Sequence, residues 1–210
     1  MSDAIRRLGS RLPGPWRAFA TLSTILILLW TLTWWLGPAV NLSLRYDRIG
    51  VLRGEGWRLL TGHLVHCSGR HLLLNIAGLG LVLELVGREF AGREWLLVTA
   101  ASVVAIDAGF LLLRPELQWY VGLSGVLHGM LAAGALAWWR SERPLFAAAL
   151  SAIVVAKLLR EQIWGALPLA GDLPVVVDAH LFGAVGGLCA AAVIIARRGS
   201  LRRAARGVRS

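Results

Sequence analysis

A serine between two glycines is the first stretch of this chain that could do chemistry. Ser124 lies in GLSG, where Gly122 and Gly125 permit a tight turn into a helix and leave the hydroxyl uncovered. Free amide groups at the start of such a helix can stabilise an oxyanion. The pattern predicts a serine nucleophile, although a serine packed where helices approach closely has the same pattern.

A nucleophilic serine needs a base, and His180 in DAHLFGAVGG is the candidate. Gly183 and Gly187 have the GxxxG spacing that lets another helix approach closely enough for Ser124 to reach His180. The alternative is a histidine that bonds to a backbone carbonyl. Asp178 lies two residues before His180, on roughly the opposite helical face, so we expect it to favour the helix start and not to contact the histidine.

The stretch HLLLN places His71 and Asn75 on one helical face, where both could donate to an oxyanion. Hydrogen bonding between helices is the alternative use of these side chains. His63, His66 and His71 are spaced by three and five residues, unlike HExxH, and no carboxylate lies beside them. The two cysteines form no CxxC motif, so neither a metal site nor any other cofactor is predicted.

The elements that must position these residues are membrane helices. The 210-residue chain has a mean hydropathy of +0.65 and only 16% charged residues, which excludes disorder and argues against a soluble domain. A span takes about 20 mostly apolar residues. An all-α membrane bundle of six spans is therefore predicted, at residues 18–37, 71–87, 94–113, 123–139, 144–164 and 174–196.

The net charge of +10 is distributed unevenly over the loops. Fourteen of the 22 basic residues precede the first span, follow the sixth, or lie between spans two and three or four and five. The positive-inside rule then places both termini in the cytoplasm and the 38–70 loop outside. The predicted parts are a cytoplasmic segment 1–17, a membrane domain 18–196 and a basic cytoplasmic tail 197–210 that contacts anionic lipid. Nucleic-acid binding is not predicted.

With this topology, spans two, four and six all begin at the outer face. His71, Asn75, Ser124 and His180 then lie at one depth, just below the outer surface. Polar side chains inside a membrane usually face the bundle interior or a water-filled cavity. We therefore expect a cavity that is open to the outside.

Three stretches together resemble rhomboid intramembrane serine proteases: GWRLLTGHLVHCSGRHLLLN (56–75), GLSG (122–125) and AHLFGAVGG (179–187). The resemblance implies that Ser124 is the nucleophile and His180 the general base, in a dyad without a carboxylate. It also implies an oxyanion site made of His71, Asn75 and the backbone amide of Ser124 or Leu123. Trp57 and Arg58 match the pair that holds the first loop of these proteases in the outer leaflet.

One difference narrows the resemblance. Many rhomboids carry an aromatic residue where this chain has His128, and that aromatic packs against the catalytic histidine. GLSGVLHG, the six-span length and the lack of a soluble domain resemble the rhombosortase branch of Gram-negative bacteria. This implies an inner-membrane enzyme with a periplasmic active site, acting on exported proteins that end in a Gly-Gly motif, a transmembrane helix and basic residues. Whether water or an amine accepts the cleaved chain stays open, and no oligomeric state is predicted.

Two other functions fit parts of the pattern. One is a rhomboid-like protein that binds transmembrane clients without cutting them, although both the nucleophile and the histidine are present. The other is a metal or proton transporter that uses His63, His66, His71 and Asp107. The lack of paired acids along one helix face counts against transport.

Overall fold

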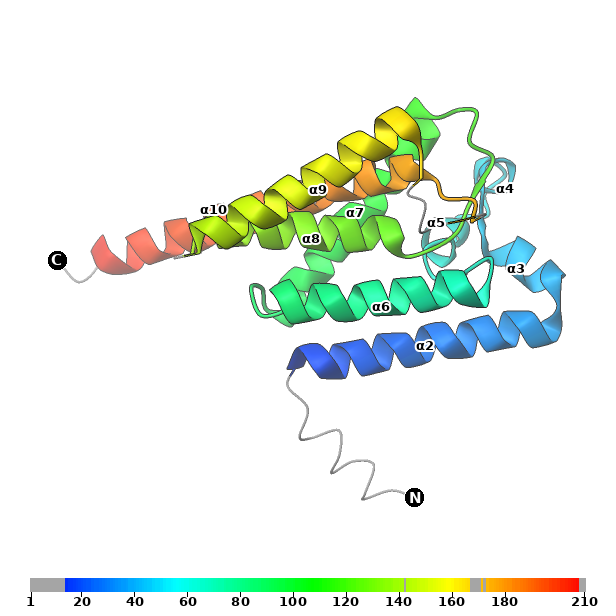
Figure 1. Ribbon diagram of the computed structural model, residues 1–210, viewed down its shortest axis with the longest axis horizontal. Helices are drawn as coiled ribbons and strands as arrows, with labels where there is room; N and C mark the ends of the chain where they lie inside the picture. Colours follow the sequence, from blue (N-terminus) through cyan, green and yellow to red (C-terminus); the bar gives the residue numbers. More distant parts are fainter. Residues whose placement is uncertain (1–13, 142, 167–170, 172, 208–210) are drawn as a thin grey trace, which may run out of the picture. The chain divides into compact units, whose positions relative to one another are not determined.

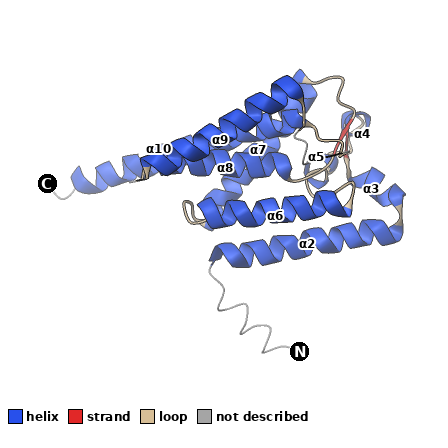
Figure 2. Cartoon of the chain, viewed as in Figure 1, coloured by secondary structure: helices blue, strands red, loops and turns tan. Residues whose placement is uncertain are grey.

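The computed structural model describes residues 14–141, 143–166, 171 and 173–207. Within these residues the chain forms nine helices and one small two-stranded sheet (Figure 2). They are arranged in two compact units, each with its own packed helices. Residues 1–13 and 208–210, which carry part of the predicted cytoplasmic ends, lie outside the described residues.

Unit 1 comprises the described residues up to Arg88 together with Trp119–Gly122. Its two long helices, α2 (Gly14–Leu36) and α6 (Gly69–Val86), run side by side in opposite directions (Figure 1). Glycines of α6 allow the close approach, because a Cβ at Gly69 would lie 3.2 Å from the Trp30 ring of α2. Ser68 caps α6 by accepting a hydrogen bond from the backbone amide of His71.

The segment predicted as the 38–70 loop contains short helices and a strand that the pattern of apolar residues did not predict. They are α3 (Pro38–Leu44), β1 (Tyr46–Asp47), α4 (Arg48–Leu52) and α5 (Arg58–Thr61). Asp47 caps α4, with its carboxylate accepting from the Gly50 amide at 3.0 Å. Strand β1 pairs antiparallel with β2 (Trp119–Tyr120), which ties this segment to the residues just before Ser124 in the chain (Figure 2).

The Trp57–Arg58 pair holds the short helices together. The Arg58 guanidinium donates to the carbonyls of Leu42 at 2.7 Å and Arg45 at 3.0 Å, at the end of α3. The Trp57 indole donates to the Ser43 carbonyl at 3.2 Å. Both residues thus satisfy carbonyls that a helix end leaves without an intrahelical partner. That they hold this segment in the outer leaflet stays a prediction.

Unit 2 contains four helices: α7 (Gly92–Leu113), α8 (Ser124–Trp138), α9 (Pro144–Trp164) and α10 (Val177–Gly207). Helix α10 packs on α7 and α8, and α9 packs on α8. Helices α8 and α10 run in the same direction, whereas α9 runs the opposite way (Figure 1). The start of α8, the end of α9 and the start of α10 are therefore at one end of this unit.

Each of the six predicted apolar segments contains a helix, but four helices of the described chain are long and apolar enough to cross a membrane. These are α2, α6, α7 and residues 177–201 of α10. Helix α8 has only 15 residues, and α9 carries Lys157, Arg160 and Glu161 in its last three turns. Helix α10 does not end at residue 196, and Arg198 bonds to Glu94 of α7. The count of six spans and the cytoplasmic termini stay predictions.

Candidate active site

The turn into α8 has the form that the GLSG pattern predicts. Gly122 has a φ of 115°, in the left-handed region that favours glycine, and Leu123 is the N-cap of the helix. Ser124 is then the first residue of α8 and is partly exposed. The first backbone amides of α8, including that of Ser124, lack an intrahelical acceptor, as at any helix start.

Helices α8 and α10 touch backbone to backbone along a row of glycines. A Cβ at Gly183 would overlap the carbonyl oxygen of Gly125, and a Cβ at Gly187 would overlap that of Gly129. The GxxxG spacing therefore serves the close helix approach that the sequence predicts. The contact involves the first two turns of α8 and the second and third turns of α10.

The close approach brings Ser124 and His180 together. His180 is in the first turn of α10, is 4% exposed, and its Nε2 atom lies 2.9 Å from Ser124 Oγ. That distance is within the range of a hydrogen bond between a nucleophile and its base. Two residues 56 positions apart in the chain thus form the pair expected for serine catalysis.

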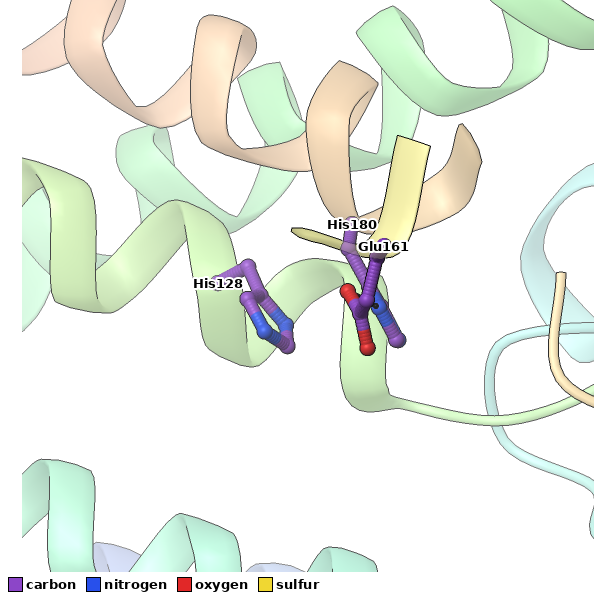
Figure 3. A group of neighbouring side chains, drawn as sticks. All are labelled: His128, Glu161 and His180. Atoms are coloured by element: carbon purple, nitrogen blue, oxygen red, sulfur yellow. Dashed lines mark hydrogen bonds and ion pairs between the residues drawn. The ribbon is translucent and has the colours of Figure 1, made fainter. Parts of the chain in front are cut away.

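Contrary to the expected dyad without a carboxylate, Glu161 of α9 contacts His180 (Figure 3). Its Oε2 atom lies 2.8 Å from His180 Nδ1, and its Oε1 atom lies 2.6 Å from Lys157 Nζ. Glu161 is 3% exposed. Charged residues in an otherwise apolar segment were the signal in the sequence that could have indicated this contact.

His128 is a second side chain in contact with His180. Its ring stacks on that of His180, with centroids 4.1 Å apart and an angle of 19° between the planes (Figure 3). Its Nδ1 atom donates to the Ser124 carbonyl at 2.7 Å, since the carbonyl can only accept. His128 therefore packs flat against the His180 ring and is bonded to the residue that carries the predicted nucleophile.

His128, Glu161 and His180 have the donor types of metal ligands. His128, Glu161 and His180 place ligand atoms within 4.8 Å of one another. Nevertheless both nitrogens of His180 and both oxygens of Glu161 already have hydrogen-bond partners. The arrangement suits proton transfer better than shared coordination.

The other predicted site residues belong to unit 1. His71 and Asn75 lie on one face of α6, and a Cβ at Gly122 would be 2.6 Å from His71 Nε2 and 3.7 Å from Asn75 Nδ2. The Asn75 amide donates to the His71 carbonyl. Both side chains therefore lie next to Gly122, two residues before Ser124 in the chain. The oxyanion site that would combine them with Ser124 and Leu123 stays a prediction.

The remaining histidines and Asp178 have structural contacts. His63 packs against Tyr120 and His66 against His71, with ring centroids 5.4 Å and 4.9 Å apart. Asp178 in the first turn of α10 bonds to Arg114 at 2.7 Å. This contact raises the pKa of the Arg114 guanidinium above its ordinary value. It also links the end of α7 to the start of α10.

Comparison with known proteins agrees with these motifs. The family model described as "Rhomboid domain" matches residues 53–197, more than half of the chain, and covers both Ser124 and His180. "Putative rhomboid protease YdcA" of Bacillus subtilis (strain 168) is 34% identical over 82 residues, which cover 39% of this chain and 41% of that protein. The aligned part thus spans less than half the length of that relative. The chain is a multi-pass membrane protein and belongs to the rhomboid family.

Proposed function

We propose that this protein is an intramembrane serine endopeptidase in which Ser124 is the nucleophile and His180 the general base. The observation that carries the proposal is the 2.9 Å contact between Ser124 Oγ and His180 Nε2 at the start of two glycine-packed helices. Membership of the rhomboid family supports the same chemistry.

The chemistry follows from the two side chains. His180 Nε2 takes the proton of Ser124 as Oγ attacks a peptide carbonyl, and then gives it to the leaving amine. The ester that remains on Ser124 is released when water, or an amine acceptor, attacks it with His180 again as the base. His71, Asn75 and the amide of Ser124 or Leu123 are the proposed donors to the oxyanion of each tetrahedral intermediate.

The proposed substrates are exported proteins with a C-terminal Gly-Gly motif, a transmembrane helix and basic residues, cut at the periplasmic face of the inner membrane. The resemblance of GLSGVLHG, which includes His128, to rhombosortases supports this class. Arginines in the predicted cytoplasmic loops support the orientation, because positive charge favours the inner side.

The test is cleavage of a reporter that carries such a tail behind a secreted soluble domain. Co-expression with the wild type should release the soluble domain, and Ser124→Ala or His180→Ala should abolish release at equal membrane levels. Ser200→Ala is the matched control, because the Ser200 hydroxyl is exposed and donates to the Ala196 carbonyl of its own helix. Cleavage that persists in the Ser124 variant contradicts the proposal.

A second arm tests the substrate class. The same reporter with Leu-Leu in place of Gly-Gly should stay intact if the tail motif is recognised. Equal cleavage of both reporters would contradict recognition of the Gly-Gly motif but not the proposed serine protease activity. A fluorophosphonate probe should also label the wild type at Ser124, and uptake of a metal ion that survives Ser124→Ala would favour the transporter alternative.

A further inference from the structure

We infer that Glu161 is the positioning residue of His180, so that the site is a Ser124–His180–Glu161 triad supported by Lys157. The inference rests on the proposed function, since it assigns a role in serine catalysis. It departs from the dyad that the family resemblance implies. A chain of contacts at one end of unit 2 carries it.

The chain begins at Lys157 and ends at Ser124. Lys157 Nζ lies 2.6 Å from Glu161 Oε1, one turn along α9. Glu161 Oε2 lies 2.8 Å from His180 Nδ1, and His180 Nε2 lies 2.9 Å from Ser124 Oγ. Four side chains from three helices thus form one continuous line of hydrogen bonds.

Donor and acceptor types fix the direction of this line. An ammonium group only donates, so Glu161 Oε1 accepts from Lys157. A carboxylate with one oxygen used in this way accepts at the other, so His180 must carry its proton on Nδ1. The Nε2 atom then has a free lone pair, and the Ser124 hydroxyl donates to it. This is the tautomer that a general base requires.

Glu161 also lies where charge develops during the reaction. When His180 takes the proton of Ser124, the imidazole becomes a cation whose Nδ1–H group still donates to Glu161. A carboxylate stabilises that cation more than a neutral acceptor does, and the effect is large because both side chains are almost fully buried. The hydrogen bond of Glu161 is to Nδ1, on the opposite side of the ring from the Nε2 atom that contacts Ser124, so Glu161 acts through His180.

A purely structural role explains these contacts less well. An ionic pair in an apolar helix is costly, and replacing it with apolar residues is often neutral or stabilising. Lys157 and Glu161 also prevent α9 from meeting the composition of a simple membrane span. A function that needs the charge next to His180 accounts for both residues.

The experiment compares charge with shape at position 161. The rate of fluorophosphonate labelling of full-length protein in detergent micelles is measured for Glu161→Gln, Glu161→Asp and Lys157→Met. Gln keeps the size of the side chain but has no charge, and it can donate to Nδ1 and select the wrong tautomer. We expect labelling to fall about 10²- to 10⁴-fold in Glu161→Gln, less in Lys157→Met, and less in Glu161→Asp than in Glu161→Gln.

This order distinguishes positioning from packing. If Glu161 only filled space, the isosteric Gln would be better tolerated than the shorter Asp. The matched control is Glu116→Gln, an exposed glutamate of the same unit that pairs with Arg114; it should label at the wild-type rate. Thermal unfolding of each variant shows whether the fold is retained.

A second measurement uses the wild type alone. The chain has five histidines, so ¹⁵N-histidine labelling gives a simple spectrum in which His180 is identified by difference from His180→Gln. The inference requires the His180 proton on Nδ1, and a proton on Nε2 overturns it whether or not the variants fold. If the Glu161→Gln variant is labelled by the fluorophosphonate at the wild-type rate, the inference is overturned. The proposed function is still supported in that case, provided that Ser124→Ala and His180→Ala are not labelled. Labelling that survives in those two variants instead removes the proposed function.

Discussion

Gly183 of α10 lies directly against the carbonyl oxygen of Gly125 in α8, so closely that a single methyl group at Gly183 would overlap it. Ser124 precedes Gly125 and His180 lies one turn before Gly183. The distance between nucleophile and base is thus set by the contact between two glycine backbones.

Gly183→Ala should therefore reduce both catalysis and stability. We expect a loss of about 1–3 kcal/mol in the free energy of unfolding from overpacking. Displacement of His180 by about 1 Å should lower the fluorophosphonate labelling rate by about 10²-fold. Gly199→Ala, on the same helix with nothing within 4 Å of the added methyl group, is the control. Unchanged labelling in Gly183→Ala would show that the glycine contact does not position the pair.

Gly122→Ala tests the contact between the turn before Ser124 and His71. Its positive φ makes any side chain strained, and the new methyl group would lie 2.6 Å from the His71 ring. Gly54 has a similar φ of 97° but nothing within 4 Å, so Gly54→Ala carries the backbone strain alone. We expect both variants to lose about 1–2 kcal/mol of stability from strain, and only Gly122→Ala to lose labelling. Equal labelling of the two variants would contradict a role for the contact with His71.

Arg58→Ala should destabilise the short helices between α2 and α6. The guanidinium is largely buried and donates to the carbonyls of Leu42 and Arg45, so its removal leaves two acceptors without this partner. A loss of about 3 kcal/mol in the free energy of unfolding is expected. Denaturant unfolding in micelles measures it, with Arg53→Ala, an exposed arginine of the same segment, as the control. If Arg58→Ala loses no more unfolding free energy than the control, the hydrogen bonds of Arg58 do not stabilise this segment.

The sequence allowed the apolar segments and the Ser124–His180 pair to be predicted, for different reasons. The helices follow from long apolar stretches, whose bounds the structure reproduces within a few residues at α6, α7, α8 and α9. The pair follows because glycines at GxxxG spacing bring two helices close. Both signals are local in sequence.

The contact with Glu161 and the fold of residues 38–70 could not be predicted in this way. Glu161 meets His180 because α9 runs antiparallel to α10 and ends where α10 begins, which no motif encodes. Helix α4 is capped by Asp47 and the end of α3 is bonded by Arg58, and neither contact follows from an apolar period. Contacts of this kind become visible only once the chain is folded.

His128 should be replaceable by another flat ring. His128→Phe keeps the stacking on His180 and loses the bond to the Ser124 carbonyl, whereas His128→Ala removes both and opens a cavity. Stacked aromatic pairs contribute about 0.5–1.5 kcal/mol beyond their buried area, so we expect His128→Phe to label several-fold faster than His128→Ala. The reverse order would mean that the hydrogen bond, and not the stacking, holds His180.

Acid should weaken the fold through His66, which lies outside the membrane helices just before α6. Burial, assisted by the neighbouring His71, lowers the pKa of His66 from 6.5 to about 3. Between pH 6.5 and about pH 3, His66 is therefore protonated in the unfolded chain but neutral in the folded chain. The free energy of unfolding falls as the pH drops through this range. At pH 5 the expected loss is about 2 kcal/mol relative to pH 7.5, at roughly 1.4 kcal/mol per pH unit below 6.5. Thermal unfolding in micelles at the two pH values measures it, and His66→Gln, which cannot titrate, should lose this part of the pH dependence. An equal pH dependence in the variant and the wild type would assign the acid sensitivity to other groups.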